Sequence, residues 1–219
     1  MILSKRLETI LSMIDPCQVL LDIGSDHAFL CIEAIKRGIA LQAIAADNKK
    51  GPIQTATFNI EQAQLSQQIT PVLSDGATSV EKPADCWVIA GMGAQTIIQI
   101  LTDSFEKSKQ VKQILLSPHS KDNQLREFLY QNGYSIIEQR IVKDDRYYPI
   151  IKVQYSGVKQ DYSLSDLLIG PMTKDHTYLD WIKHQRNHFK RLSMTNDRYI
   201  NYYQVFNQEY EYNQSQGMD

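Results

Sequence analysis

The chain has 219 residues, of which 42% are hydrophobic, and its formal net charge is −2. That length allows one full α/β domain with a smaller appendage, and the balanced charge argues against attraction to nucleic acid over the whole surface. Three widely spaced cysteines argue against a disulfide framework or a zinc site. No apolar run is long enough for a membrane span or a signal peptide, so we expect a cytoplasmic protein that binds neither metal nor membrane.

Helices and strands are predicted to alternate from residue 3 to residue 132. Leu7, Ile10, Leu11 and Ile14 recur at helical spacing and predict a helix over 3–14. Short apolar runs after it predict buried strands, and the segments between them have helical periodicity, with Pro52 placed in the first turn of one helix. The predicted strands are residues 19–23, 42–47, 69–75, 85–91 and 113–117, and the predicted helices are residues 28–37, 52–63, 95–105 and 123–132.

Two β-rich runs follow, at residues 134–142 and 147–155. Only four residues separate them, which predicts an antiparallel hairpin. Alternation of strands and helices followed by such a hairpin implies a doubly wound, mostly parallel, seven-stranded sheet with an antiparallel strand at or near one edge. This Rossmann-like α/β layout is that of the class I methyltransferases.

The pattern changes after residue 157. A helical region begins at Leu164 and is interrupted at Gly170 and Pro171. Two further stretches, 178–189 and 199–210, have helical spacing and are joined near 193–196, which predicts a helical hairpin resembling a short coiled coil. We therefore divide the chain into an α/β domain at 1–157 and a C-terminal helical domain at 158–219.

Acidic residues end three consecutive predicted strands, at the edge where open α/β sheets bind ligands. Asp22 precedes Gly24, which lets the chain turn close to a ligand. A carboxylate at Asp47 can accept hydrogen bonds from ribose hydroxyls, and one at Asp75 can accept from an adenine amino group. The pattern predicts S-adenosylmethionine as cofactor. The predicted cofactor-binding residues are Asp22, Gly24, Ser25, Asp47, Asn48, Asp75, Gly76, Ala90 and Gly91.

The loop after the first strand argues against a dinucleotide. It reads GSDHAF from Gly24, without the second and third glycines of G-x-G-x-x-G. A dinucleotide-dependent oxidoreductase needs those glycines to bring backbone amides around a pyrophosphate, a group that S-adenosylmethionine lacks. Each acid alone is equally well explained as a turn or cap residue. Three acids on consecutive strands favour the cofactor site.

Four strings together resemble the bacterial tRNA (adenine(22)-N1)-methyltransferase family: DIGSDHAFL at 22–30, AADNKKGPIQTATFNI at 45–60, SDGATS at 74–79 and IAGMGAQTIIQIL at 89–101. The resemblance is close over 1–155, and the C-terminal part has the family's usual layout. It implies that the chain is an enzyme that methylates N1 of an adenine, position 22 in the D-arm region of tRNA, with S-adenosylmethionine. The chain departs from the family pattern at Phe29, Cys31, Ala94 and 117–119.

On this resemblance the catalytic candidates are Asp26, His27 and Met92. N1 of adenine carries an in-plane lone pair, so the enzyme has mainly to align it with the methyl group. The product base is cationic, and Asp26 could stabilise that charge while His27 holds the carboxylate or hydrogen-bonds the adenine. The loop at 90–93 offers no polar side chain, which suits attack by a ring nitrogen beside Met92. A structural turn at 26–27 and a core-filling Met92 remain alternatives.

Substrate contacts are predicted in two regions. Arg6 could reach the cofactor carboxylate, Phe29 could stack on a base, and His119 follows the fifth strand on a loop that faces the pocket. For each of these, a core or solvated role is an alternative. Residues 182–198 hold five Lys and Arg residues and one acid, which predicts a local tRNA-binding surface. Its basic residues are Lys183, Arg186, Lys190, Arg191 and Arg198.

Three other functions stay open. A methyltransferase of the same fold could act on a small molecule or on another RNA, although the basic hairpin argues against a small molecule. A non-catalytic RNA-binding protein could keep a relic of the fold, although the intact set of three acids argues against it. The third is the dinucleotide-dependent oxidoreductase. We expect the protein to be a monomer whose partner is tRNA.

Overall fold

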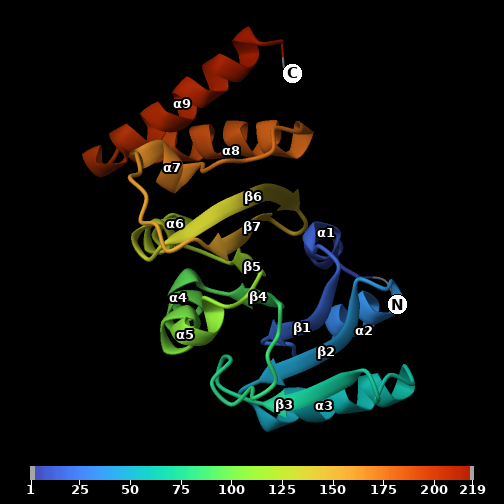
Figure 1. Cartoon of the computed structure of the whole chain (residues 1–219). Coiled ribbons are helices and arrows are strands. Elements are labelled where there is room, and N and C mark those ends of the chain that lie inside the picture. The colour runs from blue at the N-terminus through green and yellow to red at the C-terminus, as the bar shows by residue number, and fades with distance from the viewer. Residues whose placement is uncertain (1–2, 218–219) are drawn as a thin grey trace.

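The computed structural model describes residues 3–217 and contains a seven-stranded sheet with the strand order β3-β2-β1-β4-β5-β7-β6 (Figure 1). The first five strands are parallel, whereas β7 is antiparallel to both of its neighbours. The predicted mostly parallel sheet with an antiparallel strand near one edge is confirmed. The strands are β1 (Cys17–Ile23), β2 (Ala40–Asp47), β3 (Ile69–Leu73), β4 (Cys86–Met92), β5 (Gln113–Pro118), β6 (Tyr134–Lys143) and β7 (Tyr147–Tyr155).

Helices cover both faces of the sheet, as the doubly wound prediction requires. One hydrophobic core includes Ile10 and Leu30 from the first two helices, and a second includes Ile97 and Leu125 from later helices on the other face. Residues in these cores are buried on both sides of the central strands, which explains why those strands are apolar runs. The helices are α1 (Lys5–Met13), α2 (Phe29–Lys36), α3 (Lys50–Gln62), α4 (Ala94–Asp103), α5 (Phe105–Ser108) and α6 (Asp122–Gln131).

Several element ends differ from the prediction. The helix predicted over 95–105 ends at Asp103, and the short α5 follows after Ser104. The helix predicted to begin at Ala28 begins at Phe29, because Ala28 adopts a left-handed conformation with φ of +57°. Hydrophobic periodicity does not extend into cap residues. It therefore predicts the position of a helix end only to within about one or two residues.

The C-terminal helices lie beside β6, at the end of the sheet away from β3 (Figure 1). They are α7 (Leu164–Leu168), α8 (His176–Ser193) and α9 (Ile200–Ser215), and a single 3₁₀ turn at Asp197–Tyr199 joins the last two. The predicted helical hairpin is therefore confirmed. Its core of Tyr178, Trp181, Ile182 and Phe206 packs with Ile141 of β6. The division of the chain into two domains near residue 157 stays a prediction.

A buried arginine joins the sheet domain to the C-terminal helices. Arg126 of α6 is 0% exposed, and its Nε donates to Oε1 of Gln139 in β6 at 2.8 Å. Its Nη1 donates to Asp122 at 2.7 Å and to the carbonyl of Leu167 in α7 at 2.8 Å. Gln139 in turn donates to the carbonyl of Ile169 at 2.8 Å. The seam beside α7 is therefore a hydrogen-bonded polar network inside an apolar surrounding.

None of the helices in the described part of the chain is both long enough and apolar enough to cross a membrane. Among residues 3–217, no group of three or more His, Cys, Asp and Glu side chains could hold a metal ion.

Candidate active site

The first turn of the site joins the carboxyl end of β1 to α2. Gly24 has φ of +82°, and its N–H donates to the carbonyl of Ala46 in β2 at 2.8 Å. The positive φ favours glycine at this position, and the terminal methyl group of Met92 lies where a Cβ on Gly24 would be. Asp22 is 7% exposed and accepts a hydrogen bond from Oγ of Ser25 at 2.7 Å. The predicted residues of this loop are therefore packed together with the loop after β4.

Burial raises the pKa of Asp22 from 3.8 to about 6; the hydrogen bond from Ser25 opposes this rise, and the negative charge of Asp47 adds to it. The parallel pairing of β1 with β2, which runs to Ile23 and Ala46, places Asp22 and Asp47 at the same edge of the sheet. Two of the three predicted acids therefore lie at one edge of the sheet, and their role in a cofactor site stays a prediction.

We expect this shift to make stability depend on pH. Between pH 4 and pH 6 the unfolded chain loses the Asp22 proton while the folded chain keeps it, because the folded pKa of about 6 exceeds the ordinary value of 3.8. The stability contributed by Asp22 is thus greatest at low pH and falls by about 3 kcal/mol as the pH rises through this window. Asp22→Asn should abolish this pH-dependent contribution to the free energy of unfolding. Urea denaturation of both proteins at several pH values would measure it. Parallel stability curves for the two proteins would contradict the assignment.

The second part of the site lies at the ends of β2 and β3. Asp47 is half-buried, and one of its carboxylate oxygens accepts from the N–H of Lys49 at 2.9 Å. Asp75 and Asn48 are exposed. Leu73 pairs with Asp47 in the sheet and is 48% exposed, which is unusual for a strand leucine. Asp47, Asp75 and Leu73 thus lie at the ends of neighbouring strands, where the sequence predicts that the ribose and adenine bind.

Leu73 was not among the predicted site residues. The run ITPVLSD at residues 69–75 predicts only a strand that ends in an acid. Nothing in that local pattern distinguishes a leucine that is covered by a helix from one at an open strand end. Gly76, the last predicted residue here, has φ of +59° and lies against Ile100 of α4, where a Cβ would be only 3.1 Å from a side-chain carbon.

Asp26 and His27 project from a strained turn. Asp26 has φ of +39° and Ala28 has φ of +57°, a conformation that non-glycine residues seldom adopt. The carbonyl of His27 accepts from the side chain of Asn59 in α3 at 3.0 Å, which holds the turn. Nε2 of His27 lies 3.2 Å from Oδ2 of Asp26, and these side chains are 49% and 63% exposed. Both groups thus face outward, where a substrate could meet them.

The loop after β4 lies between this turn and the end of β5. Gly91 is exposed with φ of +83°, and the pairing of β4 with β5 shifts register between Ala90 and Met92. The carbonyl of Met92 accepts from the N–H of His119 at 2.8 Å. The half-buried Met92 therefore contacts the β1 turn with its side chain and the β5 loop with its backbone.

Arg6 and His119 meet over this loop, although 113 residues separate them in the chain. The guanidinium of Arg6 lies over the ring of Tyr148 at 4.8 Å, and its Nη2 is 4.0 Å from the position of a Cβ on Gly91. Arg6 can only donate, so Nε2 of His119 accepts and the ring proton is assigned to Nδ1. Burial lowers the pKa of His119, and the positive charges of Arg6 and Arg146 lower it further, which favours the neutral ring.

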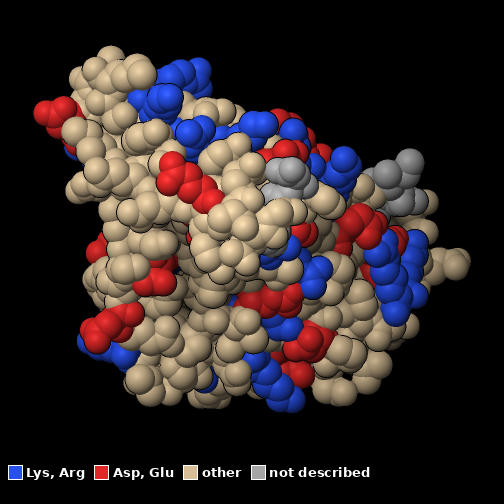
Figure 2. Space-filling model, turned by 90° about the horizontal axis from the view of Figure 1, so that it is seen from above, with Lys and Arg blue, Asp and Glu red and all other residues tan. Residues whose placement is uncertain are grey.

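The remaining candidates lie in two separate regions. Phe29 is half-buried and stacks on the His27 ring at 5.1 Å. On α8, Lys183, Lys190 and Arg191 are exposed, whereas Arg186 is half-buried and donates to Asn207 of α9 at 2.7 Å. Arg186 therefore stabilises the hairpin itself. Figure 2 views the molecule from the hairpin side and shows Lys and Arg side chains in a row along one border of that face.

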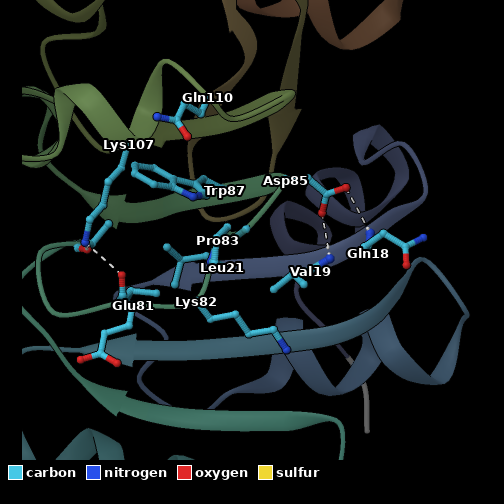
Figure 3. Close-up of a pocket in the computed structure, with 13 residues that line it drawn as sticks. Gln18, Val19, Leu21, Glu81, Lys82, Pro83, Asp85, Trp87, Lys107 and Gln110 are labelled. Carbon is cyan, nitrogen blue, oxygen red and sulfur yellow. Dashed lines mark hydrogen bonds between the residues drawn. The ribbon is translucent and has the colours of Figure 1, made fainter.

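A cavity of about 390 Å³ lies apart from these residues. Its lining includes Val19, Asp85 and Trp87, at the amino-terminal ends of β1 and β4, opposite to the edge that carries the acids (Figure 3). Asp85 accepts from the N–H groups of Gln18 and Val19 at 3.2 Å and 2.8 Å. Lys107 donates to the carbonyls of Ala77, Thr78 and Val80, each at 2.9 Å. These charged groups stabilise the loop after β3, so this cavity is not the predicted cofactor site.

Comparison with known proteins agrees with this geometry. A family model described as a methyltransferase domain matches residues 3–151. The tRNA (adenine(22)-N(1))-methyltransferase of Bacillus subtilis is 31% identical over 212 residues, which cover 89% of this chain and 87% of that protein. The structure of the B. subtilis m1A22 tRNA methyltransferase has a TM-score of 0.78 at 26% identity and covers 100% of this chain and 99% of that chain.

A second solved structure is similar over nearly the same length. It is a Streptococcus pneumoniae protein described as a tRNA (m1A22) methyltransferase, in complex with S-adenosyl-L-methionine. Its TM-score is 0.87 at 28% identity, and the match covers 95% of this chain and 100% of that chain. The similarity to both structures extends over the C-terminal helices as well as the sheet domain.

Proposed function

The chain belongs to the family of tRNA (adenine(22)-N(1))-methyltransferases, and we propose that it transfers a methyl group from S-adenosylmethionine to N1 of adenine 22 in tRNA. The observation that carries this proposal is the match to the B. subtilis enzyme, 31% identical over 89% of this chain. The arrangement of acids at the carboxyl ends of β1, β2 and β3 supports it, because these groups suit the ribose and adenine of that cofactor.

S-adenosylmethionine supplies a methyl group on a positively charged sulfur. Asp47 would accept hydrogen bonds from the ribose hydroxyls, Asp75 would accept from the adenine amino group, and the exposed Leu73 would offer an apolar contact to the adenine. Gly91, which is exposed, would leave room for the cofactor beside the β4 loop. Asp22 and Ser25 maintain the β1 turn through their hydrogen bond of 2.7 Å.

The target adenine needs alignment more than activation. Its N1 attacks with an in-plane lone pair, a new N–C bond forms as the bond from that carbon to sulfur breaks, and the base becomes positively charged. Met92 shapes the slot in which the ring lies. Asp26 stabilises the positive charge as it develops, and His27, 3.2 Å away, orients the carboxylate. Arg6, held by His119, offers a positive charge near Gly91 to the cofactor carboxylate or to a substrate phosphate.

Transfer of labelled methyl groups distinguishes this function from its alternatives. Incubation with labelled S-adenosylmethionine should label bulk tRNA and leave a pool of small metabolites unlabelled. Label in the metabolite pool alone would favour the small-molecule methyltransferase. Calorimetry that detected no binding of S-adenosylmethionine would revive the non-catalytic RNA-binding protein.

The exposed cations of α8 are the proposed tRNA surface. We expect the triple substitution of Lys183, Lys190 and Arg191 by serine to weaken tRNA binding and to lower the slope of log Kd against log salt by about 1 for each phosphate that is no longer neutralised. Filter binding at several salt concentrations measures both quantities. The matched control replaces three exposed lysines elsewhere with serine, Lys36, Lys112 and Lys159. An equal effect of both triples would mean that the α8 cations have no special role.

The partner and setting follow from the same proposal. A tRNA substrate places the protein in the cytoplasm, where the three thiols, which are free in the structure, stay reduced. In this proposal the sheet domain at 1–157 binds the cofactor, and the helical domain at 158–219 binds the RNA. We further propose that the protein acts as a monomer.

A further inference from the structure

A second cavity, of about 220 Å³, lies between the end of β5 and the C-terminal hairpin. One wall comes from the sheet domain, including Pro118, His119 and Pro149, and the other comes from the hairpin. Five aromatic side chains line it: Tyr147, Trp181, Phe189, Tyr202 and Phe206. The volume is several times that of a single water, at about 30 Å³ each in the liquid, and suits a planar heterocycle.

The aromatic walls are arranged as rigid packed surfaces. Phe189 and Phe206 stack with ring centroids 5.4 Å apart and planes inclined by 6°. Trp181 meets Phe206 edge to face at 5.6 Å, and Tyr202 meets Phe189 at 5.3 Å. Trp181 and Phe206 are buried and form the floor, whereas Tyr202 and Tyr147 are half-buried and form the sides. Such a site offers π-faces that are already ordered before a ligand arrives.

Polar groups also reach the cavity. The amide side chains of Asn123 and Gln185 line it, and both residues are half-buried. An amide presents donors and an acceptor in one plane, which suits the edge of a nucleobase. A purely apolar ligand would leave these two amide side chains without hydrogen-bond partners. The lining therefore combines faces for stacking with edges for hydrogen bonding.

The cavity adjoins the catalytic loop and the cationic helix. His119, on its rim, donates its N–H to the carbonyl of Met92 at 2.8 Å, and the N–H of Ala94 donates to Ser120 at 3.2 Å. Gln185 and Phe189 line the cavity from α8, the helix that also carries the exposed Lys183 and Lys190. The cavity therefore lies between the loop that carries Met92 and the helix that carries the exposed cations, although those cations do not themselves line it.

We propose that this cavity holds a second, unstacked base of the tRNA, a neighbour of the adenine that is methylated, and this rests on the proposed function. The reacting adenine itself belongs at Met92 and Asp26, and neither residue lines the cavity. Extrusion of a base costs stacking energy with its neighbours, and a stacking site for a neighbour offsets that cost. The pocket thereby keeps the target adenine out of the helical stack.

The test combines one protein variant with a set of modified tRNAs. Tyr202→Leu keeps an apolar side chain but removes the π-face, and we expect it to raise Kd for tRNA about tenfold. Tyr202→Phe should bind as the wild type does. Tyr203→Leu is the matched control, since Tyr203 neighbours Tyr202 on α9 and does not line the cavity. Calorimetric affinity for S-adenosylmethionine, unchanged in every variant, verifies that the sheet domain is intact.

Substrate tRNAs with a single abasic nucleotide at each position near adenine 22 identify the base. At the occupying position, removal of the base should weaken wild-type binding about tenfold and weaken Tyr202→Leu binding no further. Additive effects at every position would overturn the proposal, as would a Tyr202→Leu variant with wild-type affinity. Gln185→Leu, which removes only a polar edge, provides a second coupling test if Tyr202→Leu is unstable. Methylation of unmodified tRNA by the wild type tests the enzymatic function separately.

Discussion

Replacement of Asp26 with asparagine should lower kcat for tRNA methylation about 100-fold and leave the affinity for S-adenosylmethionine unchanged. The substitution keeps the shape of the side chain and removes the negative charge that, in the proposed mechanism, faces the methylated ring. Asp26 is 63% exposed in the free protein, but bound RNA would exclude water from it and strengthen its effect on a developing positive charge. Single-turnover rates with saturating cofactor and calorimetry with the cofactor alone separate the two quantities.

The control for Asp26 is another exposed carboxylate. Asp103 ends α4, away from the loops of the site, and Asp103→Asn should leave kcat unchanged. A kcat within about twofold of the wild type for Asp26→Asn would mean that residues 26–27 form only a structural turn. Loss of cofactor affinity in that variant would instead place Asp26 on the cofactor side.

Replacement of Arg126 with leucine should lower the free energy of unfolding by about 3–5 kcal/mol. The side chain is 0% exposed and bonds to Asp122, Gln139 and the carbonyl of Leu167. Leucine would leave the buried Gln139 and the carbonyl of Leu167 without their donor, and its shorter side chain would not fill the space of the arginine. Urea denaturation monitored by tryptophan fluorescence would measure the loss.

Arg140 provides the matched comparison. It pairs with Glu138, two residues earlier in β6, and its side chain is 38% exposed. Arg140→Leu should change stability by less than about 1 kcal/mol, because exposed ion pairs contribute little. Equal losses in the two variants would contradict a special role for the buried network of Arg126.

Much of the fold was predictable because its determinants are local. The apolar runs at β1 and β4 and the glycine stops identify a parallel sheet, and the short connection between β6 and β7 identifies the hairpin. The acids at 22, 47 and 75 could be assigned to one site because the carboxyl ends of parallel strands meet at one edge. Each of these inferences needs only a short stretch of sequence and a general rule of topology.

The features that were not predicted depend on contacts between distant segments. Arg6 meets His119 because α1 packs against β6 and β7, and no local pattern encodes that contact. The sequence pattern places Tyr147 only in a predicted strand, and it places Phe189 and Tyr202 only in predicted helices. Their common cavity exists because the hairpin packs against β6, which brings three separate segments together.

The central claim is methylation of one adenine at N1, and nucleoside mass spectrometry tests it most directly. A tRNA with adenine 22, incubated with the protein and S-adenosylmethionine and then digested to nucleosides, should yield 1-methyladenosine. The same tRNA with guanine at position 22 should yield none. Absence of 1-methyladenosine from the first tRNA, or its presence in equal amount from the second, would contradict the account.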